Sequence, residues 1–236
     1  MTALARLGDL GIVPVVEVPS VDRAVPLGRA LLAAGLSCAE ITFRTTAAVD
    51  AIRALRDACP DLLVGAGTIL TVDQADAAVA AGASFLVSPG FNPHVVDHAR
   101  GRDVPMVPGV CTPSEIEGAL ASHVEVMKFF PAEVAGGVAF LKAIAPVYPT
   151  VRFVPTGGVG PSNLADYLAL PNVLACGGSW MVRKDLIAAG DFAGIERLAT
   201  EAVRLARSVR RGPAGKSTDD RRPAGATFGA RSGRPG

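Results

Sequence analysis

A lysine inside a strongly apolar segment is the residue of this sequence best suited to covalent chemistry. Lys128 follows Val-Glu-Val-Met and precedes Phe-Phe-Pro. Side chains alternate along a strand, so Val124, Val126 and Lys128 would share one strand face. If that face is buried, desolvation disfavours the ammonium form, and a neutral amine can attack a ketone carbon to form a Schiff base. In the alternative, Glu125 and Met127 face inward, and Lys128 reaches solvent between helices.

A carboxylate on another apolar run is the second candidate. Glu40 would share one strand face with Thr42 and Arg44. A carboxylate inside a sheet and near a lysine could move the protons of imine formation and aldol cleavage. The alternative is a structural ion pair between Glu40 and either Arg44 or Lys128.

Two glycine-containing segments could bind an anion. Residues 155–159 (Pro-Thr-Gly-Gly-Val) follow one predicted strand, and residues 177–179 (Gly-Gly-Ser) follow the next. Glycine lets backbone N–H groups approach an anion closely, and helix starts favour negative charge. Turns also favour glycine, but loops after the seventh and eighth strands of a (β/α)8 barrel commonly bind phosphate. Together the two segments predict a phosphorylated substrate.

Other polar residues give weaker signals. His94 and His98 have a spacing of four residues that could bind a metal, but no third ligand follows in a known pattern. We expect these two and His123 to be exposed helix residues, and we predict no metal site. Ser88 lacks a plausible histidine partner for a hydrolase triad. Glu17 ends a predicted strand, and nothing in the sequence assigns it a role.

The elements that must position these residues are short apolar runs that alternate with amphipathic segments. The candidate strands are residues 12–18, 38–43, 62–67, 84–88, 104–109, 124–130, 151–157 and 172–178. Helical patterns cover residues 21–35, 46–58 and 72–82. Gly35 and Gly82 indicate helix ends, and Thr71 and Thr112 lie where N-caps belong.

Eight strand-then-helix units in about 200 residues predict an α/β fold, a single (β/α)8 TIM barrel. An open doubly wound sheet is the alternative. The strand count favours the barrel, as does the lack of a Gly-x-Gly-x-x-Gly motif after the first strand. Catalytic side chains of such barrels lie at the C-terminal ends of the strands.

Composition supports one large core, because 50% of the 236 residues are hydrophobic and only 19% are charged. The four cysteines have no CxxC-like spacing, which argues against a zinc site or a disulfide scaffold. Three of them lie in or beside apolar stretches and are predicted to be buried. No apolar run approaches the roughly 20 residues of a membrane span. We therefore expect a soluble, cytoplasmic protein without membrane partners.

The C-terminal segment differs from the rest of the chain. Residues 210–236 are rich in Gly, Pro, Arg and Ser and carry a net charge of +5, whereas residues 1–209 sum to −4. Such a composition predicts a disordered basic tail after a barrel domain at 1–209. It could contact nucleic acid or an acidic partner, but the solvated tail is the favoured interpretation.

With these residues placed, the sequence closely resembles the 2-keto-3-deoxy-6-phosphogluconate aldolase / 4-hydroxy-2-oxoglutarate aldolase family over about residues 10–207. The matching stretches are EITFRT (40–45), VGAGT (64–68), VSPG (87–90), PGV (108–110), MKFFPAE (127–133), PTGGV (155–159) and GGSW (177–180). Two departures are the basic tail and a short leader, from which we expect a reduced N-terminal helix.

The resemblance implies a (β/α)8 barrel, usually a homotrimer, that uses no metal or other cofactor. It makes Lys128 the Schiff-base lysine and Glu40 the general acid/base, while Arg44 and Thr68 hold the pyruvate carboxylate. It implies a phosphate site formed by Thr156, Gly157, Gly158, Gly178 and Ser179.

The expected reaction is cleavage of 2-dehydro-3-deoxy-6-phosphogluconate to pyruvate and glyceraldehyde 3-phosphate, with 4-hydroxy-2-oxoglutarate as a second substrate. An aldolase for the galactonate epimer is the alternative within the same class. A barrel scaffold with a nucleic-acid-binding tail is the alternative from another class, and its only support is residues 210–236.

Overall fold

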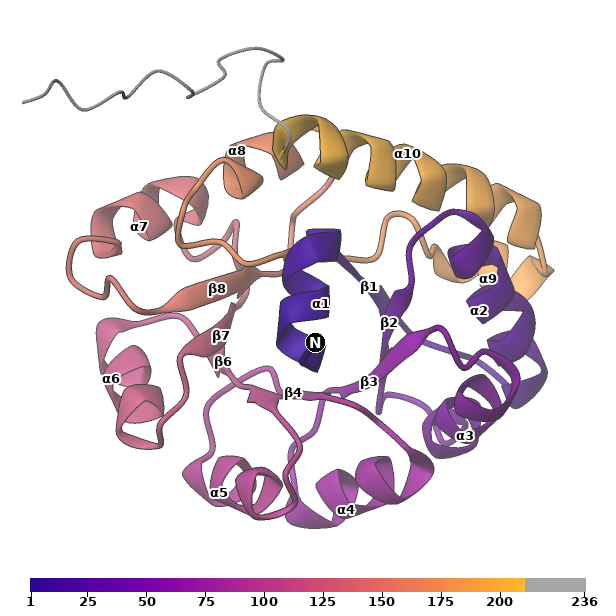
Figure 1. The fold of residues 1–236 in the computed structure, drawn as a ribbon, viewed down its shortest axis with the longest axis horizontal. Helices are drawn as coiled ribbons and strands as arrows, with labels where there is room; N and C mark the ends of the chain where they lie inside the picture. Colours follow the sequence, from indigo (N-terminus) through magenta and orange to yellow (C-terminus); the bar gives the residue numbers. More distant parts are fainter. Residues whose placement is uncertain (211–236) are drawn as a thin grey trace, which may run out of the picture.

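The computed structural model describes residues 1–210, in which helices surround a set of short strands (Figure 1). The strands are β1 (Ile12–Val16), β2 (Cys38–Thr42), β3 (Leu63–Gly67), β4 (Leu86–Val87), β5 (Met106–Val107), β6 (Gly109–Val110), β7 (Val126–Phe129), β8 (Arg152–Pro155) and β9 (Cys176–Gly178). The helices are α1 (Ala3–Leu10), the 3₁₀ helix η1 (Val21–Arg23), α2 (Ala24–Ala33), α3 (Ala48–Ala58), α4 (Val72–Ala81), α5 (Pro93–Gly101), α6 (Pro113–Ala121), α7 (Gly137–Ile144), α8 (Leu164–Leu168), α9 (Lys184–Ala189) and α10 (Phe192–Arg210).

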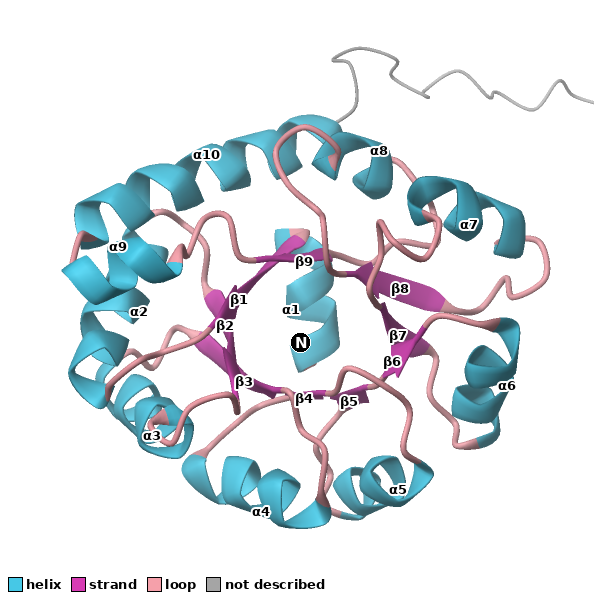
Figure 2. Cartoon of the chain, turned by 180° about the vertical axis from the view of Figure 1, so that it is seen from behind, coloured by secondary structure: helices cyan, strands magenta, loops and turns pink. Residues whose placement is uncertain are grey.

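The strands pair in parallel and curl around a common centre, with the helices other than α1 outside them (Figure 2). One sheet has the order β5-β4-β3-β2-β1-β9, and the other has the order β6-β7-β8. Isolated parallel bridges join Phe153 to Val173 and Thr156 to Gly177. The strand–helix alternation and the parallel pairing confirm the predicted α/β class, because parallel neighbours need a crossover connection.

A proline divides one predicted strand into two. The run at 104–109 appears as β5 and β6 on either side of Pro108. Proline has no N–H to donate to a strand ladder, but its carbonyl still accepts a hydrogen bond from the Lys128 N–H at 2.8 Å. The segment before Pro108, β5, pairs with β4, and the segment after it, β6, pairs with β7. In the second pairing Gly109 lies opposite Lys128.

The predicted helix signals are present in the structure. Thr71 and Thr112 cap α4 and α6 through their side-chain oxygens, and Glu115 completes a capping box with Thr112. Gly82 ends α4 in the left-handed region at a φ of 100°, where glycine avoids the Cβ penalty. These caps fix where each helix begins and so set the loops that follow the strands.

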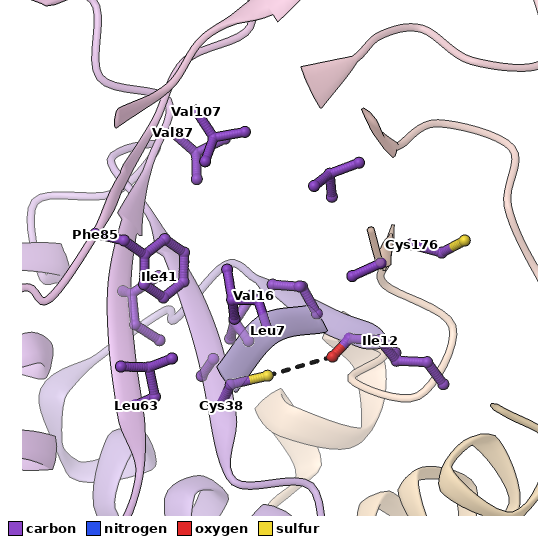
Figure 3. Close-up of a cluster of buried hydrophobic side chains, with 14 of the residues drawn as sticks. Leu7, Ile12, Val16, Cys38, Ile41, Leu63, Phe85, Val87, Val107 and Cys176 are labelled. Carbon is purple, nitrogen blue, oxygen red and sulfur yellow. Dashed lines mark hydrogen bonds between the residues drawn. The ribbon is translucent and has the colours of Figure 1, made fainter. Parts of the chain in front are cut away.

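The N-terminal segment forms the eight-residue helix α1, capped by Thr2, and whether this helix is reduced relative to other family members stays a prediction. In Figure 1 it lies across the centre of the ring of strands. Its Leu7 is 2% exposed and belongs to the same buried cluster as Ile12 and Cys38 (Figure 3). The Cys38 thiol donates to the Ile12 carbonyl at 3.3 Å. As predicted for three cysteines, Cys38, Cys59 and Cys176 are buried.

The predicted basic tail lies outside the described residues except for Arg210, which is the last residue of α10. The Arg210 guanidinium donates a hydrogen bond to the Leu174 carbonyl. Among residues 1–210, no helix is both long and apolar enough to cross a membrane.

Candidate active site

Lys128 and Glu40 meet in the interior although they lie 88 residues apart in sequence. Lys128 on β7 donates from Nζ to Oε1 of Glu40 on β2 over 3.5 Å, and the two residues are 5% and 3% exposed. Phe129, on the opposite face of β7, stacks on Phe140 of α7 with ring centroids 4.9 Å apart. The lysine side chain therefore points away from the helix layer. It does not reach solvent between helices.

Glycines on β3 make room for the Glu40 carboxylate. Gly65 is the register partner of Glu40, and Gly67 is the partner of Thr42. A Cβ added at Gly67 would lie 2.1 Å from Glu40 Oε1. The Thr42 hydroxyl donates to the Val16 carbonyl at 2.8 Å, which ties β2 to β1 beside the carboxylate. The sequence Gly-Ala-Gly on β3 thus has a steric function, which the strand pattern alone did not reveal.

The lysine has an aromatic neighbour that the sequence reasoning missed. The Nζ atom of Lys128 lies 5.3 Å from the centroid of the Phe130 ring, within the range of a cation–π contact. Phe130 follows Lys128 by two residues, so strand alternation could have placed both side chains on one side. On the neighbouring strand β6, Gly109 is the register partner of Lys128. A Cβ at Gly109 would lie 2.0 Å from the Pro89 carbonyl oxygen.

Two of the buried cysteines, Cys38 and Cys176, are poor nucleophiles. Burial raises the pKa of the Cys38 thiol well above its usual range. Burial also raises the pKa of Cys176 to about 12. Nucleophilic attack requires the thiolate, so these buried thiols are unreactive near neutral pH.

Arg44 and Thr68, the predicted carboxylate ligands, follow β2 and β3. The Arg44 side chain is half exposed, and its Nη1 lies 4.0 Å from Glu17 Oε2. Thr68 has a φ of 59°, a left-handed conformation that is a genuine outlier for a β-branched residue. Such strain costs about 1–3 kcal/mol and clusters at functional sites. Among residues 1–210, neither side chain forms a hydrogen bond or ion pair with Lys128.

The predicted phosphate residues line one cavity of about 460 Å³. Gly157 and Gly158 have φ values of 98° and 83°, which other residues rarely adopt. The cavity lining includes Thr156, Gly157, Gly158, Gly178 and Ser179. Lys128, Glu40 and Thr68 do not line it, but Val15, the register partner of Glu40, does. The cavity therefore reaches the part of β1 that pairs with Glu40.

Two residues that sequence reasoning missed support the glycine loop. The Glu133 N–H donates to the Gly157 carbonyl at 3.1 Å. Its side chain covers Gly158, where a Cβ would lie 2.4 Å from Glu133 Cγ. The buried Tyr167 hydroxyl donates a hydrogen bond to the Glu133 carboxylate. Burial and the Glu133 carboxylate raise the pKa of Tyr167, so its hydroxyl stays protonated as a donor.

A larger cavity of about 710 Å³ lies at the opposite end of the strands, beside α1. Its lining includes Thr2, Asp103 and Glu125, and none of the predicted site residues contributes to it. In parallel α/β sheets ligands bind at the carboxyl ends of the strands, so catalysis at the N-terminal ends is not expected. We therefore place the candidate site at the smaller cavity, which Arg44 and the predicted phosphate-binding residues line.

The histidines do not form a site. His94 is exposed on α5, as expected, while His98 is partly buried, and its Nε2 lies 3.0 Å from Asp76 Oδ1. His123 follows α6 at a φ of 58°. Within residues 1–210, no three His, Cys, Asp or Glu side chains gather closely enough to hold a metal ion. The Ser88 hydroxyl donates to the Gly90 carbonyl at 2.7 Å, which is a loop contact.

The fold and the site together define an α/β protein with a buried amine beside a carboxylate and a glycine-lined cavity. An amine in this setting can attack a carbonyl carbon, and the adjacent carboxylate can transfer protons. Backbone N–H groups of glycine segments with positive φ can bind an anion. This is the arrangement expected of an enzyme that binds an anionic carbonyl compound covalently.

Comparison with known proteins gives the family. The sequence model of the aldolase family described as "KDPG and KHG aldolase" matches residues 4–198. The chain belongs to this family.

Individual relatives agree with that assignment. The chain is 52% identical to the 2-dehydro-3-deoxy-phosphogluconate aldolase of Treponema pallidum over 87% of this chain and 98% of that protein. It is 46% identical to the KHG/KDPG aldolase of Escherichia coli K12 over 81% of this chain and 90% of that protein. A crystal structure of the Legionella pneumophila KDPG aldolase superposes with a TM-score of 0.82 at 38% identity, covering 85% of this chain and 98% of that one. That structure holds pyruvate as a covalent carbinolamine intermediate.

Proposed function

We propose that this protein is a class I aldolase that cleaves 2-dehydro-3-deoxy-6-phosphogluconate to pyruvate and glyceraldehyde 3-phosphate. The observation that carries the proposal is the buried pair in which Lys128 Nζ lies 3.5 Å from Glu40 Oε1, in a chain of the aldolase family. The covalent pyruvate adduct of the Legionella relative supports a Schiff-base mechanism.

In this mechanism the Lys128 amine attacks the C2 ketone, and loss of water gives a protonated imine that withdraws electrons from the C3–C4 bond. Glu40, directly or through a water, takes the proton of the C4 hydroxyl. The C3–C4 bond breaks, glyceraldehyde 3-phosphate leaves, and an enamine remains on Lys128. Protonation of the enamine at C3 and hydrolysis of the resulting imine release pyruvate and restore the amine.

The remaining predicted residues bind the two anionic ends of the substrate. Arg44 and Thr68 hold the carboxylate, for which a guanidinium offers paired donors. The phosphate is bound by Thr156, Gly157, Gly158, Gly178 and Ser179, which share the glycine-lined cavity. The names of relatives such as the Treponema protein favour the gluconate substrate over its galactonate epimer. The E. coli relative supports 4-hydroxy-2-oxoglutarate as a second substrate.

We also propose that the strands form one closed (β/α)8 barrel. Two observations support closure: the isolated bridges that join Phe153 to Val173 and Thr156 to Gly177, and the hydrogen bond from the Lys128 N–H to the Pro108 carbonyl between β5 and β6. From the family resemblance we also propose that the protein is a homotrimer and that it works in the cytoplasm. Size-exclusion chromatography with light scattering should then give a molar mass three times that of one chain. A molar mass equal to that of one chain would contradict the trimer.

The test of the proposed reaction is release of pyruvate from each substrate, followed with a coupled dehydrogenase. The wild-type protein should release pyruvate, and Lys128→Met should lose more than about 10³-fold in kcat, because the covalent route disappears. The matched control is Lys142→Met, which removes an exposed lysine on α7 and should leave kcat unchanged. A folded Lys128→Met protein with near-normal turnover would overturn the assignment.

A further inference from the structure

The wall of the glycine-lined cavity contains an ion pair, Glu17 with Lys184, that the proposed mechanism does not use. Glu17 follows β1, and Lys184 is the first residue of α9. Lys184 Nζ lies 2.7 Å from Glu17 Oε2, which is also 4.0 Å from Arg44 Nη1. All three line the same cavity as Gly178 and Ser179. The Glu17 carboxylate would by itself repel an anionic substrate in this cavity, and Lys184 pairs with it.

The three cationic side chains that line this cavity, Arg44, Arg183 and Lys184, differ in the partners they already have. Arg183 forms a two-point contact with Asp185, at 3.0 Å from Nε and 2.6 Å from Nη2. Its donors therefore already face a carboxylate. Arg44 follows β2, and the proposed function gives it the substrate carboxylate. Lys184 has a side chain that is 69% exposed and pairs with one residue, Glu17.

An ammonium has three donors, so Lys184 can keep its contact with Glu17 while it donates to another acceptor. The neighbouring glycine segments offer backbone N–H groups that carry only partial charges. A phosphate monoester carries nearly two negative charges at neutral pH. A charged donor binds phosphate more strongly than neutral N–H groups do, and Lys184 lines the same cavity as the glycine segments.

We propose that Lys184 is a specificity-determining residue of this site: its ammonium, held at the cavity rim by Glu17, binds the terminal phosphate of the substrate. The proposal rests on the proposed function, since it assumes that a phosphorylated keto acid occupies the cavity. Glu17 acts as the positioning residue, because it fixes a long side chain that would otherwise sample many rotamers. Lys184 thereby biases the enzyme toward phosphorylated over unphosphorylated substrates.

The kinetic test compares kcat/KM for 2-dehydro-3-deoxy-6-phosphogluconate with kcat/KM for 4-hydroxy-2-oxoglutarate. In Lys184→Met the ratio of the two should fall about tenfold, through KM of the phosphorylated substrate, because a charge-assisted contact is lost. Lys184→Arg should restore most of the ratio. Lys142→Met, which removes the same charge from α7, should leave it unchanged. An unchanged ratio in Lys184→Met would overturn the proposal.

A binding measurement separates this inference from the proposed function. Titration calorimetry with glycerol 3-phosphate should give a Kd about tenfold weaker for Lys184→Met than for the wild-type protein. Equal Kd values would overturn the assignment of Lys184. If the wild-type protein cleaved neither substrate while the two Kd values still differed, the proposed function would fail and Lys184 would stand as a phosphate ligand.

Discussion

The approach of Lys128 to Glu40 is the feature on which the chemistry depends. The alternation of side chains along β7 and β2 predicts which face of its strand each residue occupies. In the structure both residues are buried, and Lys128 Nζ lies 3.5 Å from Glu40 Oε1. Sequence spacing could not show that β2 and β7 bring these side chains together, because they lie 88 residues apart. For the same reason the contact between Glu17 and Lys184 was not predicted.

At the residue scale, the proton-transfer role of Glu40 can be tested without removing its bulk. Glu40→Gln keeps the shape of the side chain but cannot accept the C4 hydroxyl proton, so kcat should fall by about 10²–10⁴-fold. Because the Lys128 amine remains, the variant should still form a pyruvate adduct, more slowly. Turnover and adduct formation should be measured on the same preparation. Wild-type turnover in a folded Glu40→Gln protein would show that Glu40 is only a structural partner of Lys128.

At the element scale, β3 positions the site because two of its residues, Gly65 and Gly67, have no side chain. Its Gly-Ala-Gly sequence leaves space for the Glu40 carboxylate and for the Phe85 ring, which lies 2.2 Å from a Cβ built on Gly65. Sequence patterns placed this strand within a residue or two of its observed ends. They could not show which side chains would fill the space opposite its glycines, because that depends on the neighbouring strands.

A methyl group at Gly67 should displace the catalytic carboxylate. In Gly67→Ala the new Cβ would lie 2.1 Å from Glu40 Oε1, so the carboxylate must move. We expect kcat to fall by about 10²-fold and the free energy of unfolding to fall by about 1–3 kcal/mol. The control is Gly101→Ala at the end of α5, where no heavy atom lies within 4 Å of the new methyl group. Unchanged kcat in Gly67→Ala would contradict the steric argument.

The link from α8 to the glycine loop gives a second test at this scale. Tyr167→Phe removes the hydroxyl that binds Glu133, whose side chain covers Gly158. KM for the phosphorylated substrate should rise by about 5- to 10-fold, since a buried hydrogen bond is lost and the loop loses its support. Tyr148→Phe is the matched control, because its hydroxyl contacts Glu117 in an exposed position. Equal effects in the two variants would exclude a positioning role for Tyr167.

At the scale of the whole molecule, the parallel order of the strands brings residues from both ends of the chain to one cavity. Glu17 comes from the end of β1, and Lys184 comes from the start of α9. The repeated strand–helix pattern predicted the α/β class and the parallel pairing, because each helix must return the chain to the same end of the sheet. It did not predict the division at Pro108, which depends on the missing N–H of that proline, or the packing of Leu7 of α1 into the buried cluster.

The proposed site lies entirely within residues 1–210, so the segment beyond it should be dispensable for catalysis. A chain that ends at Arg210 keeps the contact between Arg210 and Leu174 and every proposed site residue. Its kcat/KM and thermal midpoint should match those of the full chain at both low and high salt. A salt-dependent loss of activity in the shortened chain would instead give the segment 211–236 a role in substrate binding.

The most direct test of the central claim is trapping of the covalent intermediate. The protein is incubated with pyruvate, reduced with borohydride and digested, and the peptides are analysed by mass spectrometry. A reduced pyruvate adduct on Lys128, absent from Lys128→Met, is the predicted result, because borohydride converts the imine to a stable secondary amine. A folded wild-type protein with no adduct, or with an adduct on another lysine, would contradict the Schiff-base mechanism assigned to Lys128.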